Sequence, residues 1–143
     1  MKIVDANVLI YAADRSAPRH DAARRWLETA LNGAEPVGIP WVSTLAFIRI
    51  ATNRRIYPHP LSTTQAFDVA NLLLSNPNVV IPEPDSDHAR RMATLLEPLG
   101  TAGNLVTDAH IAAIAISHDA DVVTFDNDFD RFAGVRRLTP DIP

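Results

Sequence analysis

The residues of this chain best suited to chemistry are aspartates that stand at the ends of apolar runs. Asp5 directly follows Ile3-Val4, and Asp126 directly follows Val122–Phe125. In an open sheet of parallel strands, ligands bind beyond the carboxyl ends of the strands, so we expect both carboxylates at the same edge. Asp108 stands at the start of a helical pattern, and its place beside the other two is an inference that strand geometry does not require.

Carboxylates gathered in one place have a specific chemical use. They repel one another, and without a cation one of them is protonated. Mg²⁺ and Mn²⁺ prefer oxygen ligands and keep several of their waters, so a divalent ion resolves the repulsion. Two such ions about 4 Å apart clamp a phosphodiester on both the attacking and the leaving side. This chemistry requires no cysteine nucleophile, which fits a chain without cysteine.

Each aspartate also has an explanation that involves no metal. Asp5 is placed to cap the helical turn that follows it, and Asp108 suits a helix N-terminus with Thr107 as its N-cap. The aspartates of the segment 126–130 are also typical of turns. A calcium-binding EF-hand loop is excluded, because the segment lacks the required glycine and glutamate. The sequence alone leaves the metal and the structural explanations open.

Short apolar strands alternate with amphipathic helices along the chain. Ser62 to Gln65 has the spacing of a capping box. The expected strands lie near residues 2–5, 36–40, 79–81, 122–125 and 135–138, and the expected helices near 7–13, 18–31, 43–53, 62–76, 85–96 and 108–118. Strands that are apolar throughout indicate a mostly parallel sheet covered on both faces, here of about five strands. Residues 1–143 are therefore expected to form one α/β domain.

Composition excludes several classes of protein. The net charge of −4 argues against broad attraction to nucleic acid, although all basic residues except Lys2 are arginines, which suit phosphate contacts. With no cysteine, disulfides and thiolate metal sites are excluded. The longest uncharged apolar run, Ile111–Ile116, is too short for a membrane span, and no signal-peptide pattern opens the chain. We therefore expect a cytoplasmic protein without a membrane anchor.

Three segments together resemble the PIN-domain ribonucleases, and among them the VapC-like toxins of toxin–antitoxin pairs. The segments are Val4–Tyr11, Thr107–Ala115 and Val123–Phe129, in this order along the chain. The resemblance implies a PIN-like three-layer fold, with a short parallel sheet between helices. It implies a magnesium-dependent endoribonuclease in which Mn²⁺ can replace Mg²⁺. It also implies a cognate antitoxin that covers the site, and a homodimer within the toxin–antitoxin complex.

Residue roles follow from the resemblance position by position. Asp5, Asp108 and Asp126 are implied to be the metal ligands and catalytic carboxylates. Thr124 is implied to orient a ligand or a water, and Asp128 either supports the site or forms a turn.

Arginines near one expected helix end are candidates for RNA binding. Arg49, Arg54 and Arg55 are placed to contact RNA phosphates at the mouth of the site, and a solvated helix end and loop is the equal alternative. The five histidines show no spacing typical of metal ligands.

One position departs from the family pattern. Family members commonly have a glutamate on the helix expected at 43–53, where this chain has no acid and has Leu45 or Phe47 instead. With less negative charge, the site is expected to bind one ion well and a second only with substrate. The missing acid also keeps open a catalytically silent binding module of the same fold, which acts through protein contacts. A phosphotransferase with an aspartate nucleophile is disfavoured, because the only lysine is Lys2.

Overall fold

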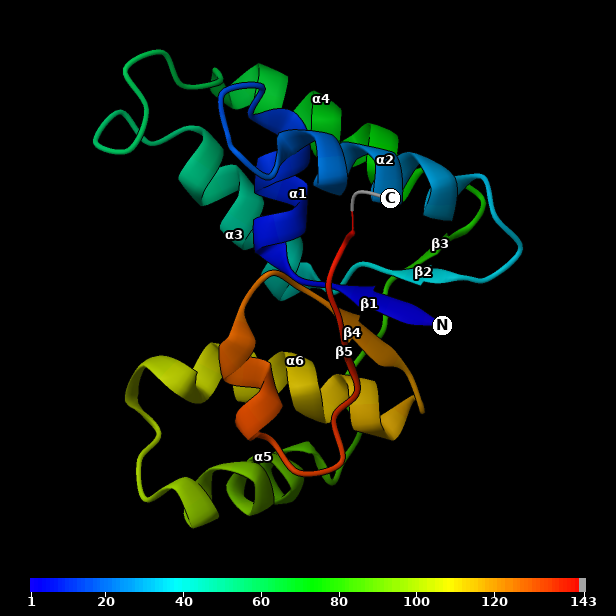
Figure 1. Ribbon diagram of the computed structural model, residues 1–143, viewed down its shortest axis with the longest axis vertical. Coiled ribbons are helices and arrows are strands. Elements are labelled where there is room, and N and C mark those ends of the chain that lie inside the picture. The colour runs from blue at the N-terminus through cyan, green and yellow to red at the C-terminus, as the bar shows by residue number, and fades with distance from the viewer. Residues whose placement is uncertain (142–143) are drawn as a thin grey trace.

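The computed structural model describes residues 1–141 and is built around one sheet (Figure 1). Five parallel strands lie in the order β3-β2-β1-β4-β5. They are β1 (Lys2–Val4), β2 (Val37–Gly38), β3 (Val79–Val80), β4 (Asp121–Val123) and β5 (Arg137–Leu138). The chain extends the sheet on one side of β1 and then returns to extend it on the other. The switch point between β1 and β4 is therefore the place where a parallel sheet forms a ligand crevice.

Helices cover both faces of the sheet, so the predicted three-layer α/β fold is confirmed (Figure 1). One face carries α1 (Ala6–Ala13), α2 (His20–Leu31), α3 (Trp41–Ala51) and α4 (Thr63–Leu74), and the other carries α5 (His88–Leu96) and α6 (Val106–Ser117). Three short 3-10 helices complete the described chain, namely η1 (Glu97–Leu99), η2 (Gly103–Leu105) and η3 (Asn127–Arg131).

Alternate residues of the central strands belong to the two cores. Ile3 and Val122 join the cluster under α5 and α6, whereas Val4 and Val123 join the cluster under α1, α2 and α3. This is the two-residue period of a β-strand, since successive side chains point to opposite faces. All four side chains are fully buried. Asp5 and Thr124, which follow these pairs, are thereby fixed at the same edge of the sheet.

Several boundaries differ from those expected. α6 begins at Val106 rather than at Asp108, because η2 runs directly into it. The N-cap is Leu105, so the prediction of Thr107 as N-cap is wrong. The capping box of α4, from Ser62 to Gln65, is confirmed, and it satisfies two backbone donors of the first turn.

No helix among residues 1–141 combines the length and the apolar character that a membrane span requires. The cytoplasmic location expected from the sequence stays a prediction.

Candidate metal centre

Asp5 links the end of β1 to the start of α1. Its Oδ1 accepts a hydrogen bond from the Ala6 N–H at 2.7 Å, so the capping explanation is correct. Its Oδ2 accepts from Asn7 Nδ2 at 2.9 Å and from Thr124 Oγ1 at 2.7 Å. A carboxylate accepts at about four lone-pair positions, so these three bonds leave room for a cation. The side chain is only 8% exposed, and this burial raises its pKa, while the Thr124 hydroxyl opposes the rise.

Thr124 joins the two strand ends that carry the acids. Its hydroxyl donates to Asp5 and accepts from Asn7 Nδ2 at 2.9 Å and from the Asp126 N–H at 3.0 Å. A threonine hydroxyl offers one donor and two acceptor positions, so this fully buried group has its bonding capacity filled. The network fixes Asp5, beyond β1, relative to Asp126, beyond β4. Thr124 therefore orients the side chain of Asp5, and its role toward a ligand or a water stays a prediction.

Asn7 completes the same network, and sequence reasoning did not single it out as a site residue. Its Nδ2 donates to both Asp5 and Thr124, and its Oδ1 accepts from the Phe125 N–H at 3.3 Å. The side chain therefore holds the first turn of α1 against the segment that follows β4. The sequence offered the position of this amide, two residues after a strand-terminal aspartate, but not its partner Thr124, which lies more than a hundred positions away.

Three carboxylates form a group of the size that a metal ion requires. One oxygen from each of Asp108, Asp126 and Asp128 lies within 4.8 Å of the others, and all three side chains are partly buried. Among residues 1–141, this is the one group of three or more acidic or histidine side chains so arranged. Asp5 is not a member of the group, but its charge contributes to the raised pKa of Asp108, and the charge of Asp126 contributes to the raised pKa of Asp5.

Asp126 and Asp128 also have structural roles. Asp126 Oδ1 accepts from the Asp128 N–H at 2.8 Å and caps η3, so the turn explanation of this segment also holds. Asp128 lies 3.7 Å from the Arg131 guanidinium, a distance at which it remains available to a ligand. Asp130 instead makes a bidentate ion pair with Arg137, at 2.8 and 2.9 Å, outside the acidic group.

The electrostatics of Asp108 show that the site is short of positive charge. Burial, together with the charges of Asp5, Asp126 and Asp128, raises the pKa of this carboxyl to about 7. A divalent cation among the oxygens would reverse the effect, because it favours the ionised form. Oxygen-only donors of this kind suit hard cations such as Mg²⁺ and Mn²⁺. The residues present therefore fit a divalent ion.

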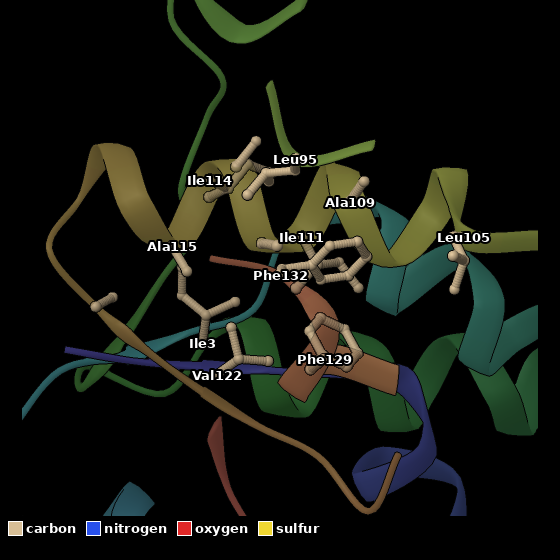
Figure 2. Packing of buried hydrophobic residues seen from close by; sticks show 13 residues of the cluster. Ile3, Leu95, Leu105, Ala109, Ile111, Ile114, Ala115, Val122, Phe129 and Phe132 are labelled. Atoms are coloured by element: carbon tan, nitrogen blue, oxygen red, sulfur yellow. The ribbon is translucent and has the colours of Figure 1, made fainter. Parts of the chain in front are cut away.

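Core packing places the start of α6 beside η3. Figure 2 shows Phe129 and Phe132 packed beneath α6, with Ile111 of this helix beside them. Leu105 and Ala109 belong to the same core cluster. Phe129 is fully buried, and its ring meets that of Phe132 edge to face, with centroids 6.0 Å apart. This contact between α6 and η3 brings Asp108 to the acids that follow β4, a placement that the sequence left as an inference.

α3 contributes no carboxylate. Leu45 is 58% exposed and Phe47 is buried in the core, so neither side chain offers an oxygen ligand. Leu45 and Arg49 instead line a hollow beside Thr107, the residue before Asp108. The polar group that α3 brings to the sheet edge is Ser43, whose hydroxyl donates to the Val4 carbonyl at 2.7 Å.

The three arginines predicted to bind RNA lie on α3 and in the loop that follows it. Arg49 is exposed and faces the hollow next to Thr107. Arg54 and Arg55 lie beyond the far end of α3, a helix about 16 Å long, and Arg54 borders a separate pocket of the following loop. None of the three lines the pocket around Asp126. Their contacts with RNA stay a prediction.

Comparisons with known proteins identify the family and the fold. The family model described as PIN domain matches residues 2–135. Ribonuclease VapC37 of Mycobacterium tuberculosis is 46% identical over 136 residues, which are 95% of this chain and 94% of that protein. The fold also resembles a VapBC2 structure of Rickettsia felis bound to a promoter DNA fragment, with a TM-score of 0.71, 19% identity and 98% coverage of both chains. A structure of Mycobacterium tuberculosis VapC20, titled a sarcin–ricin loop cleaving toxin, gives a TM-score of 0.67 at 19% identity, over 95% of this chain and 99% of that one.

The family match spans nearly the whole sequence, and the identity to VapC37 extends over nearly the full length of both proteins. The three segments that carry the resemblance contain the acids gathered at the edge of β1 and β4. This chain therefore belongs to the PIN-domain family, among the relatives of the VapC ribonucleases.

Proposed function

We propose that this chain is a magnesium-dependent endoribonuclease, the toxin of a VapBC-like toxin–antitoxin pair, with Asp5, Asp108 and Asp126 as metal ligands. The observation that carries the proposal is the close group of Asp108, Asp126 and Asp128, whose oxygens lie within 4.8 Å of one another. Burial, and then the neighbouring carboxylates, raise the pKa of Asp108 to about 7, as expected of a site without its cation. The names of the relatives support the reaction class, since VapC37 is named a ribonuclease and VapC20 is described as a sarcin–ricin loop cleaving toxin.

Each carboxylate has its own part in the reaction. Asp5 is oriented by Asn7 and Thr124, so its free lone pair points in a fixed direction. Asp108 holds a proton near neutral pH and releases it when a cation binds, since ligands must be deprotonated. Asp126 is held by its place after β4. A divalent ion held by these residues would supply Lewis acidity for polarising the phosphodiester and the attacking water.

Asp128 extends the proposed site beyond the three principal acids. Its oxygen belongs to the close group with Asp108 and Asp126, so we assign it a supporting role as ligand or as acceptor for a metal-bound water. α3 adds no acid to the site. We therefore propose that the free protein binds one ion and that a second ion binds only together with the substrate phosphate.

The proposal includes partners. RNA is the substrate, an antitoxin protein covers the site, and the toxin pairs as a homodimer within the complex. The support is indirect: the neighbouring structure from Rickettsia felis is described as a VapBC complex on promoter DNA. We also propose a cytoplasmic location for the complex.

A cleavage assay with a matched control tests the proposal. Purified protein is incubated with ribosomal and transfer RNA in Mg²⁺ or Mn²⁺, with and without EDTA. We expect cleavage that EDTA abolishes and that Asp5→Asn lowers at least about a hundredfold, the loss typical of an electrostatic catalytic group. Asp68→Asn is the control, because it makes the same chemical change at an exposed residue of α4. Cleavage that ignores EDTA or the Asp5 substitution contradicts the proposal.

The second candidate is a PIN-like module that binds a protein and cleaves nothing. The absence of an acid on α3 is the observation that favours it. Divalent ions that stabilise the protein without any RNA cleavage would favour this module over the ribonuclease.

A further inference from the structure

A pocket of about 400 Å³ lies beside the acids and contains two aromatic rings as well as carboxylates. It is lined by Asn7, Tyr11, Phe125, Asp126, Asn127 and Asp128. Phe125 directly precedes Asp126, and Tyr11 lies one helical turn after Asn7, on the same side of α1. Metal coordination uses the oxygens of this pocket and has no need of the rings.

The two rings and one cation form a compact arrangement. The centroids of Tyr11 and Phe125 are 5.5 Å apart, with the planes tilted by 55°. The guanidinium carbon of Arg19 lies 5.1 Å from the centroid of Phe125. Both rings are partly buried, whereas Arg19 is exposed. The guanidinium is therefore held near the ring and still accessible to a ligand.

The arrangement is held in place by hydrogen bonds from the metal centre and from α2. The Phe125 N–H donates to Asn7 Oδ1 at 3.3 Å, so its backbone is part of the network around Asp5. His20 Nδ1 lies 2.9 Å from the Tyr11 carbonyl, where it donates a hydrogen bond. These hydrogen bonds fix the position of the two rings relative to the carboxylates.

The order of groups matches a single nucleic-acid strand. Carboxylates that hold a cation attract one phosphate, the aromatic faces attract a base, and Arg19 attracts the next phosphate. Unpaired RNA bases stack on aromatic side chains and on arginine planes, whereas bases inside a duplex are not available for such contacts. An apolar peptide segment would not explain an exposed arginine beside a pocket lined mainly by polar residues.

We propose that Tyr11, Phe125 and Arg19 form a subsite for the nucleotide next to the cleaved phosphodiester. Its unpaired base stacks on the aromatic pair, and Arg19 contacts its outer phosphate. The proposal rests on the ribonuclease function proposed above and names the residues that would hold one nucleotide of its substrate.

The first test leaves the protein unaltered. Short single-stranded RNAs, each with one iodouridine, are irradiated with the wild-type protein in Ca²⁺, and the crosslinked residues are identified by mass spectrometry. We expect crosslinks at Tyr11 or Phe125. Crosslinks confined to other residues, or no crosslink from RNA that binds, overturn the proposal.

The second test uses variants and separates this proposal from the general one. Phe125→Leu keeps an apolar side chain but removes the aromatic face, and we expect RNA binding to weaken by roughly 5- to 150-fold, with KM raised more than kcat is lowered. Phe67→Leu is the control, because it makes the same change at an exposed ring of α4. Arg19→Gln, at an exposed position, gives a further variant without a buried change, and weaker RNA binding is again expected.

Each outcome has a distinct meaning. Metal-dependent cleavage with the same KM in wild type and Phe125→Leu overturns the subsite and leaves the ribonuclease standing. A protein that cleaves no RNA, but crosslinks at Tyr11 or Phe125, loses the ribonuclease and keeps the RNA-binding subsite. If Phe125→Leu and Arg19→Gln weaken binding of an antitoxin but not of RNA, the rings recognise protein and the proposal is wrong.

Discussion

Replacement of Asp108 by asparagine is expected to stabilise the protein in the absence of metal. The substitution keeps the size and shape of the side chain and removes one negative charge from the group that includes Asp126 and Asp128. It also removes the dependence of folding on the titration of this carboxyl. In EDTA, Asp108→Asn should therefore be more stable than the wild type. The same substitution at an aspartate with a purely structural role would not increase the stability.

The size of the effect follows from the pKa. The carboxyl of Asp108 rises from 3.8 to about 7, and at about 1.4 kcal/mol for each pKa unit the cost is at most about 4 kcal/mol. Asp108 is partly exposed, so solvent screening reduces the expected gain to about 1–2 kcal/mol. The folded state retains the proton more strongly than the unfolded chain. This part of the stability is therefore complete below about pH 4 and is lost as the pH rises through about 7.

Urea unfolding followed by circular dichroism measures this difference. In EDTA at pH 8 we expect Asp108→Asn to be the more stable protein, with a smaller advantage at pH 5. Added Mg²⁺ should raise the stability of the wild type more than that of the variant, since ligand binding stabilises the folded state. Asp68→Asn should change little under either condition. A variant that is no more stable than the wild type at pH 8, or equal stabilisation of both by Mg²⁺, would refute the reasoning.

Three further predictions follow from individual contacts. Thr124→Val leaves the Asp126 N–H without its acceptor and removes one of the three hydrogen-bond donors to Asp5. We therefore expect at least about a tenfold loss of cleavage, with much less loss in Thr124→Ser. Burial lowers the pKa of His88 and of its hydrogen-bonded partner His110, so the contribution of this pair to stability should fall as the pH drops below 6.5. Urea unfolding should show this fall in a comparison of the wild type with His88→Phe, since both share the opposite effect of Asp108. Phe129→Ala should cost about 3–5 kcal/mol in thermal or urea unfolding, and Phe129→Leu much less.

The part of the site that follows strands could be predicted from the sequence. Asp5 directly follows the apolar pair Ile3-Val4 at the end of β1, and Asp126 follows the end of β4 with two residues between. Parallel pairing of β1 with β4 therefore places both at one edge. The alternation of strands and helices predicted a mostly parallel sheet, and the observed strand order is compatible with that prediction. These features depend on local periodicity and on the direction of strands, which a single sequence carries.

The part that depends on tertiary packing was beyond the sequence. Asp108 reaches the acids because η2 continues into α6 and because Phe129 packs beneath that helix, neither of which has a local signature. Asn7 was missed as a site residue because its role depends on Thr124, a residue more than a hundred positions away. Asp128 was left between site and turn, and the geometry gives it both the turn hydrogen bond and a place in the acidic group.

The central claim is that Asp5, Asp108 and Asp126 hold a divalent ion at the edge of β1 and β4. Anomalous diffraction from crystals soaked in Mn²⁺ tests it most directly, because Mn²⁺ replaces Mg²⁺ at oxygen sites and its position is seen independently of the protein. We predict an anomalous peak among these three carboxylates, lost in crystals of Asp108→Asn. A peak elsewhere, or an unchanged peak in the variant, would contradict the claim.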